Sequence, residues 1–187
     1  GAFPTKSDAE KITGRMRKMG INLIRFHHID NPWSNGSLFY GVTGTRKFNP
    51  VLLDRLDYLI YQLKENGIYV NMNLNVSRTF ENSDGVYAAD SLSDFGKGIT
   101  LFNRQMIELE KEYAQKLLGH VNPYTGIPLA QDPVLAMVEI VNENSLFRRW
   151  YGDDLKPISE GGSLPLLYSL ELDSLWRDFL FKKYNST

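Results

Sequence analysis

The chain has 187 residues, of which 42% are hydrophobic and 23% are charged, so it is long and apolar enough for a globular domain with a sizeable core. Its formal net charge of -1 gives no electrostatic reason to expect a nucleic acid or an anionic membrane surface as a partner. Because it contains no cysteine, disulfides, thiolate nucleophiles and thiolate metal sites are excluded.

The first expected elements are a helix and a strand. Ser7-Asp-Ala-Glu10 forms a capping box, apolar residues then recur at helical spacing, and Gly20 ends the helix. Ile21–His27 has the composition of a strand. A loop rich in glycine, asparagine and serine follows it over residues 28–49.

A second helix and a second strand come next. Asn49 caps the helix, Pro50 occupies its first turn, and Asn66-Gly67 ends it. In the strand Ile68–Leu74, amides alternate with apolar residues, so one face is amide-rich and the other is apolar. An antiparallel strand with one face in water would alternate in the same way. The helices on either side favour a parallel sheet instead.

A third strand is expected to end at a carboxylic acid. After a loop over residues 75–100, a helix is expected over residues 101–118. The apolar run Val134–Val141 has the length of a strand that is covered on both faces. It stops at Asn142-Glu143-Asn144-Ser145, which places one acid among amides at a strand end, where α/β barrels hold their active sites. The alternative is a polar loop with a solvated glutamate.

A last helix is expected over residues 170–184.

This order of elements predicts an α/β fold with adjacent parallel strands and the helices on one convex side. No internal repeat, low-complexity tract or linker divides the chain, so residues 1–187 are expected to form part of one domain. By alternation, Arg25 and His27 share a face of the first strand, and Glu139 shares a face with Glu143. Because an arginine inside a barrel needs a carboxylate partner, we expect Glu139 within reach of Arg25.

Aromatic residues fall in several polar loops. Examples are Pro32-Trp33, Phe39-Tyr40 and Trp150-Tyr151. Flat aromatic faces suit a sugar-binding cleft, whereas ordinary core and loop packing is the alternative for each of these residues.

Three segments carry a family resemblance. They are Gly20-Ile-Asn-Leu-Ile-Arg-Phe-His-His28, Asn66-Gly-Ile-Tyr-Val-Asn-Met-Asn-Leu74 and Val138-Glu-Ile-Val-Asn-Glu-Asn144. Through them the chain resembles the clan A glycoside hydrolases, specifically the cellulase-like family 5 relatives, whose signature is an Asn-Glu pair at a strand end. The resemblance implies that residues 1–187 are the N-terminal portion of a catalytic (β/α)8 barrel. This partial TIM barrel is expected to hold strands two to four and their helices.

The same resemblance implies a retaining glycoside hydrolase that cleaves O-glycosidic bonds in polysaccharides or oligosaccharides. Glu143 matches the family's general acid/base, and Asn142 matches the amide that hydrogen-bonds the sugar 2-hydroxyl. Arg25 matches the arginine that orients the nucleophile. The nucleophile of the family lies on the seventh strand, so it is expected outside this chain. The chain alone is therefore expected to be inactive.

Four further residues are candidates for contact with a sugar. His27 and His28 stand at a strand end and are able to bond sugar hydroxyls, although a histidine in such a place is as often a structural hydrogen bonder. Asn75 stands where many relatives carry a histidine, and an amide also bonds a hydroxyl. Trp33 is a candidate for stacking on a sugar ring.

Two other classes of protein remain open. A non-catalytic carbohydrate-binding barrel would show the same aromatic loops and amide-rich strand, with Glu143 as a hydrogen-bonding group only. A different α/β enzyme has less support, because the chain has no nucleophile elbow, no P-loop and no dinucleotide-binding glycine motif. Neighbouring strand residues point to opposite faces, so His27 and His28 are not expected to share a metal ion. A carbohydrate is the expected partner, without a cofactor.

No stretch approaches the ~20 apolar residues of a membrane span, and the first residues lack the apolar core of a signal peptide. The sequence leaves the location undetermined, and the family resemblance is compatible with a secreted or periplasmic one. The sequence leaves the sugar, its linkage and the oligomeric state open.

Overall fold

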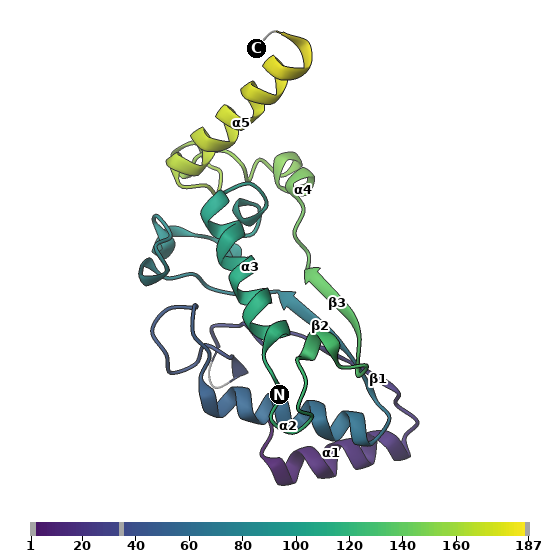
Figure 1. Ribbon diagram of the computed structural model, residues 1–187. Coiled ribbons are helices and arrows are strands. Elements are labelled where there is room, and N and C mark those ends of the chain that lie inside the picture. Colours follow the sequence, from purple (N-terminus) through teal and green to yellow (C-terminus); the bar gives the residue numbers. More distant parts are fainter. Residues whose placement is uncertain (1–2, 34–35, 186–187) are drawn as a thin grey trace. The chain divides into compact units, whose positions relative to one another are not determined.

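The computed structural model describes residues 3–33 and 36–185 (Figure 1). The chain folds into two compact units. The first unit comprises Gly1–Thr79 and Leu109–Glu143, and the second comprises Phe80–Glu108 and Asn144–Thr187. Within the described residues, none of the helices combines the length and apolarity that a membrane span needs.

A three-stranded parallel sheet forms the centre of the first unit. Its strands are β1 (Leu23–Phe26), β2 (Tyr69–Asn75) and β3 (Leu135–Val141), in the spatial order β1-β2-β3. Arg25 pairs with Asn71 in the register of β1 and β2, and Asn73 pairs with Glu139 in the register of β2 and β3. The predicted adjacent parallel strands are therefore confirmed, because both pairings are parallel.

Helix α1 (Lys6–Lys18) begins earlier than the sequence predicted. The hydroxyl oxygen of Thr5 accepts the N–H of Asp8 at 3.2 Å, so Thr5 is the N-cap and Ser7 lies inside the helix. The expected capping box at Ser7 is therefore wrong, because the neighbouring threonine already satisfies an orphan N–H of the first turn. Gly20 follows the helix with a φ of 75°, as expected for a helix stop.

The crossover helices are α2 (Pro50–Glu65) and α3 (Arg104–Gly119). The side chain of Asn49 accepts the N–H groups of Val51 and Leu52, which confirms the predicted cap of α2. Helix α3 begins three residues later than predicted, because Ile99–Leu101 forms a separate 3₁₀ turn and Asn103 accepts the N–H of Met106.

The core of the first unit lies on the helix-covered face of the sheet. Val70 and Met72 of β2 are fully buried against Leu63 of α2, and the same core includes residues of α1 and α3. Helices α1 and α2 lie side by side in Figure 1 and contact each other along their lengths. The opposite face of β2 carries Asn71 and Asn73. The predicted division into an apolar and an amide-rich face is confirmed.

Strand β3 is less buried than the sequence predicted. The side chains of Val138 and Ile140 are 38% and 72% exposed. Val138 pairs with Met72 and so faces the helix side of the sheet, but β3 is an edge strand and only β2 pairs with it within the described residues. The expectation that β3 is covered on both faces is therefore wrong for residues 3–33 and 36–185.

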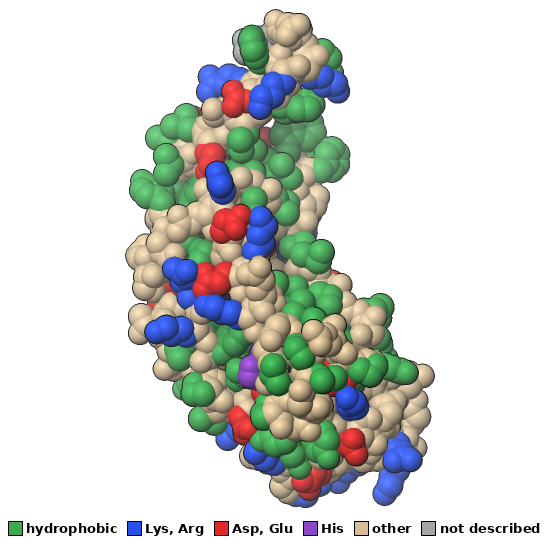
Figure 2. Space-filling model, viewed as in Figure 1, with side chains coloured by type: hydrophobic (Ala, Val, Ile, Leu, Met, Phe, Trp, Pro, Cys, Tyr) green, Lys and Arg blue, Asp and Glu red, His purple; other side chains and the backbone are tan. Residues whose placement is uncertain are grey.

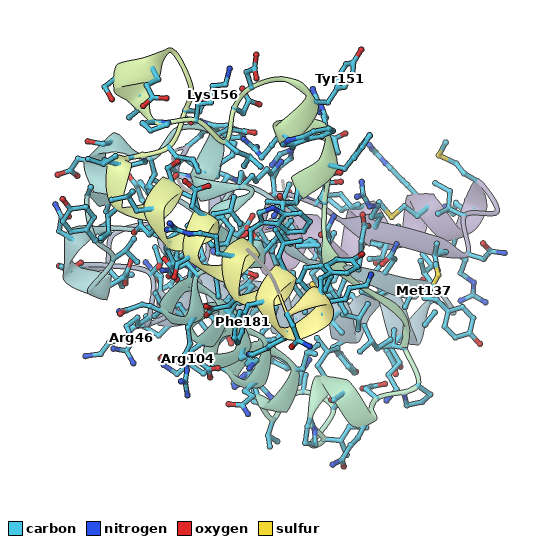
Figure 3. All side chains as sticks on the ribbon, turned by 90° about the horizontal axis from the view of Figure 1, so that it is seen from above. Arg46, Arg104, Met137, Tyr151, Lys156 and Phe181 are labelled. Carbon is cyan, nitrogen blue, oxygen red and sulfur yellow. The ribbon has the colours of Figure 1, made fainter. Side chains whose placement is uncertain are left out.

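The second unit contains α4 (Leu146–Tyr151), α5 (Leu166–Tyr184) and most of the loop after β2. Helix α5 begins earlier than the predicted residue 170, directly after Pro165. The loop is tied to α5 by a hydrogen bond of 2.8 Å from Asn103 to Glu171. Hydrophobic side chains are frequent among charged ones on the visible surface around α5 (Figure 2). Tyr151 points outward at the end of α4 (Figure 3).

Two methionines of the sheet provide a stability test. Met72→Ala should lower the free energy of unfolding by about 2 to 5 kcal/mol, because it empties a fully buried position. Met137→Ala is the matched control, because Met137 pairs with Asn71 on the opposite face and is 49% exposed (Figure 3). The change in the free energy of unfolding for Met137→Ala should stay within about 0.5 kcal/mol. Urea unfolding followed by circular dichroism measures both values, and equal losses would contradict the assignment of the core face.

Candidate functional site

The candidate site lies where the three strands of the first unit end. Parallel strands bring their carboxyl ends to one edge of the sheet, so the residues after β1, β2 and β3 meet there. His27 follows β1, Asn75 ends β2, and Asn142 follows β3. The backbone N–H of Asn142 donates to the carbonyl of Asn75 at 2.8 Å, which continues the pairing of β2 and β3 up to the acid.

A bidentate ion pair spans the sheet below this edge. Nε of Arg25 donates to Oε2 of Glu139 at 2.8 Å, and Nη2 donates to Oε1 at 2.8 Å. The prediction that Glu139 lies within reach of Arg25 is confirmed. The hydrogen bond from Arg25 holds the pKa of Glu139 below its usual range. Both side chains are about one-third exposed, at 38% and 32%, so the pair is only partly withdrawn from water.

Arg25 also fixes the orientation of Asn142. Its Nη2 donates to Oδ1 of Asn142 at 2.9 Å. Because an amide has one oxygen and one nitrogen, this bond turns Nδ2 of Asn142 away from Arg25 and leaves it as the donor end. One guanidinium on β1 therefore holds both a carboxylate of β3 and the amide directly beyond β3.

Glu143 has an unusual backbone conformation. Its φ is 49°, in the left-handed region that residues other than glycine rarely adopt. Such a conformation costs on the order of 1 kcal/mol or more and is often found at functional sites. The side chain of Glu143 is exposed, and its charge contributes to raising the pKa of Arg25 after the larger effect of the hydrogen bond to Glu139.

The two histidines lie side by side rather than on opposite faces. Strand β1 ends at Phe26, and His28 has a φ of 59°, so the alternation of a strand no longer applies. The ring centroids of His27 and His28 are 4.0 Å apart in an edge-on arrangement, which corrects the expectation of opposite directions. Nδ1 of His27 lies 3.1 Å from the amide of Asn73, and Nδ1 of His28 lies 2.9 Å from the hydroxyl of Ser77. Burial lowers the pKa of His27, with smaller contributions from His28 and Arg25.

Trp33 extends this aromatic group. Its ring centroid is 5.4 Å from that of His28, and its side chain is 54% exposed. In contrast, Phe39 is buried in the core of the first unit, so ordinary packing explains it. Within residues 3–33 and 36–185, no three His, Asp or Glu side chains gather closely enough to hold a metal ion.

Asn75 is almost fully buried at the end of β2. Its side chain is 8% exposed, and its amide nitrogen donates to Oε1 of Glu110 on α3. Glu110 was not among the residues predicted from the sequence. A helical pattern places it next to the buried Leu109, which is the only signal the sequence offers.

Asp30 and Arg78 anchor the loops around the strand ends, and both were missed. The carboxylate of Asp30 accepts backbone N–H groups from Val76, Ser77 and Arg78 at 2.8 to 3.2 Å. Burial raises the pKa of Asp30, while these N–H groups act in the opposite direction. The buried guanidinium of Arg78 donates to Thr45 and to the carbonyl of Leu109 at 2.8 to 2.9 Å.

The second unit has a groove of its own. It has a volume of about 730 Å³, and its lining includes the aromatic residues Phe147, Trp150 and Trp176. These three side chains are exposed, whereas Arg149 between two of them is buried and paired with Asp94. Trp150, which was expected in a polar loop, instead lies on α4, and it is a surface residue.

Comparisons with known proteins support the fold. Neither a protein-family model nor a curated protein sequence matches the chain. An endo-β-1,4-mannanase from Thermotoga petrophila matches with a TM-score of 0.55 and 22% identity over 76% of this chain and 32% of that protein. An endo-1,4-β-mannanase from Rhizomucor miehei matches with a TM-score of 0.52 and 21% identity over 75% of this chain and 40% of that protein.

A glycoside hydrolase family 5 mannosidase from Rhizomucor miehei matches with a TM-score of 0.53 and 19% identity over 73% of this chain and 38% of that protein. Over about three-quarters of its length, the chain thus shares the fold of these glycoside hydrolases, one of which is named as a member of family 5. It spans less than half the length of each of these proteins.

The ion pair at the strand ends is open to a direct test. Arg25→Met should raise the pKa of Glu139 toward its ordinary value, because the hydrogen bond that stabilises the charged carboxylate is lost. In the unchanged protein, the pair stabilises the fold above the ordinary pKa of glutamate, and this contribution is lost as the pH falls through the lowered pKa. A ¹³C NMR titration of the Glu139 carboxyl carbon measures the change.

Arg17→Met is the matched control, because it removes an exposed arginine from α1. It should leave the titration of Glu139 unaltered. An equal shift in both variants would show that overall charge, rather than the contact with Arg25, sets the pKa.

Proposed function

We propose that the chain is the N-terminal part of a retaining glycoside hydrolase barrel, in which β1, β2 and β3 are strands two to four. The observation that carries this proposal is the contact of Arg25 with both Glu139 and Asn142, directly before Glu143. The parallel strand order and the likeness to family 5 structures support it. The open edge of β3 would then carry the fifth strand.

In this proposal Glu143 is the general acid/base. Retaining hydrolysis needs one carboxylic acid to protonate the leaving oxygen and a second carboxylate, ~5 to 5.5 Å away, to attack the anomeric carbon. After the leaving group departs, the first residue takes a proton from water, and that water releases the sugar from the second. Glu143 is exposed at a strand end, as the acid must be to reach a glycosidic oxygen. The nucleophile would come from a later strand of the barrel.

Asn142 and Arg25 would position the sugar and the nucleophile. The bond from Arg25 to Oδ1 of Asn142 leaves Nδ2 as the donor for a 2-hydroxyl, a contact that strengthens in the transition state. Trp33, next to the ring of His28, would stack on a sugar ring. His27 and Asn75 would contribute hydroxyl contacts.

The substrate would be a polysaccharide or an oligosaccharide. The names of the structural neighbours make a β-1,4-linked mannan the first substrate to test. A non-catalytic carbohydrate-binding barrel is the second candidate, because the amide-rich face of β2 and the exposed Trp33 suit sugar binding without hydrolysis.

The isolated chain should not hydrolyse glycosides. With Glu143 as the acid/base and the nucleophile on a later strand, only one of the two required carboxylates is in place. Reducing-end release from β-1,4-mannan and from cellulose should equal that of a buffer blank. Release that is abolished by Glu143→Gln would place both carboxylates within the 187 residues and would refute the assignment of the nucleophile.

Glu143→Gln tests the acid/base role in a complete barrel enzyme that contains this chain. The change removes the proton donor but keeps the shape of the side chain, so turnover of a natural glycoside should fall by roughly 10² to 10⁴-fold. An aryl glycoside with a good leaving group needs little protonation, so its first step should be less affected. Added azide should rescue the second step, because it attacks the glycosyl-enzyme without general base help.

Glu160→Gln is the matched control, because Glu160 is an exposed glutamate on a 3₁₀ turn of the second unit. The Glu160→Gln enzyme should be as active as the unmodified enzyme. Sugar binding that persists without any turnover in the unmodified barrel would instead favour the non-catalytic candidate.

A further inference from the structure

Glu110 faces the end of β2 from helix α3. It follows the buried Leu109 in α3, and it is itself partly buried. Its Oε1 accepts the amide nitrogen of Asn75. The contact joins a carboxyl group that the proposed reaction does not use to a residue at the strand ends.

The surroundings of Glu110 bring its pKa close to neutral pH. Removal from water raises the pKa of Glu110 to about 7. Arg78, beyond β2, acts to lower it, and Asp30, in the loop after β1, acts to raise it. Tyr113, one turn along α3, responds to the same two charges, and burial raises its pKa well above the ordinary range. Near pH 7 Glu110 therefore exists in both protonation states.

The ionised and the protonated carboxyl group form different hydrogen bonds with an amide. An ionised carboxylate only accepts hydrogen bonds, so it binds the nitrogen of Asn75 and turns the oxygen away. A protonated carboxyl also carries a donor, and this donor is able to bind the oxygen of Asn75 instead. Rotation of the carboxamide by half a turn exchanges the two arrangements. The charge of Glu110 thus determines which end of Asn75 is free.

We propose that Glu110 is a positioning residue that sets the direction of the Asn75 carboxamide at the carboxyl end of β2. Ionised Glu110 holds Asn75 with its oxygen turned away from α3, where it accepts a hydrogen bond. Protonated Glu110 permits the reverse orientation, in which Asn75 becomes a donor. The consequence for a sugar hydroxyl rests on the function proposed above, whereas the coupling of the two side chains does not.

The coupling is measured by NMR on the 187-residue chain without any sugar. The Nδ2 resonances of Asn75, assigned from their loss in Asn75→Ser, are followed in ¹H–¹⁵N spectra from acidic to alkaline pH. They should show one transition with a midpoint near 7, the pKa of Glu110. Glu110→Gln should abolish this transition, because glutamine does not titrate.

Glu112→Gln is the matched control. Glu112 lies two residues along α3, where its bonds with Arg46 and Lys116 lower its pKa to about 2. It is therefore ionised throughout the titration, and its replacement should leave the Asn75 transition in place. A transition that persists in Glu110→Gln would assign it to Asp30 or another group and would overturn the proposal.

The unmodified chain provides a second test, which does not depend on the folding of a variant. The carboxyl carbon of Glu110 and Nδ2 of Asn75 should titrate with the same midpoint. Asn75 resonances that stay constant while Glu110 titrates would overturn the proposal. Failure of the chain or of its parent barrel to bind or cleave sugars would refute the proposed function but would not alter this result.

Discussion

The arrangement of the strand ends depends on the hydrogen bonds of the Arg25 guanidinium. It reaches from β1 to Glu139 of β3 and to Asn142 directly beyond, so it crosses the full width of the sheet in the first unit. A planar fork with several donors is suited to this task, because it bonds two oxygens of one carboxylate and still has a donor for an amide. The orientation of Asn142 and the charge of Glu139 both follow from it.

A second, buried layer supports the loops around that edge. Asp30 binds three successive N–H groups after β2, and Arg78 binds Thr45 and the carbonyl of Leu109. Buried charges are costly unless their hydrogen bonds are satisfied, so removal of either partner would leave unpaired polar groups. The same two charges act on Glu110, whose pKa is raised by burial, lowered by Arg78 and raised by Asp30. Stability and the polarity of the candidate site therefore depend on the same residues.

The exposed apolar residues of β3 follow from its position in the sheet. Val138 and Ile140 are exposed because only β2 pairs with β3 within the described residues. The composition of β3 is that of an interior strand, whereas its surroundings within the described residues are those of an edge strand.

The sequence by itself determined the order of the three strands and the four long helices, the two faces of β2 and the pairing of Arg25 with Glu139. Those features follow from local caps, from the two-residue period of strands and from the need of a charge for a partner. Only the tertiary structure decided the direction of His28, the contact of Glu110 with Asn75 and the roles of Asp30 and Arg78. Each of these features depends on residues from different loops and helices. Which residues meet is decided by where the chain folds back and not by a local sequence pattern.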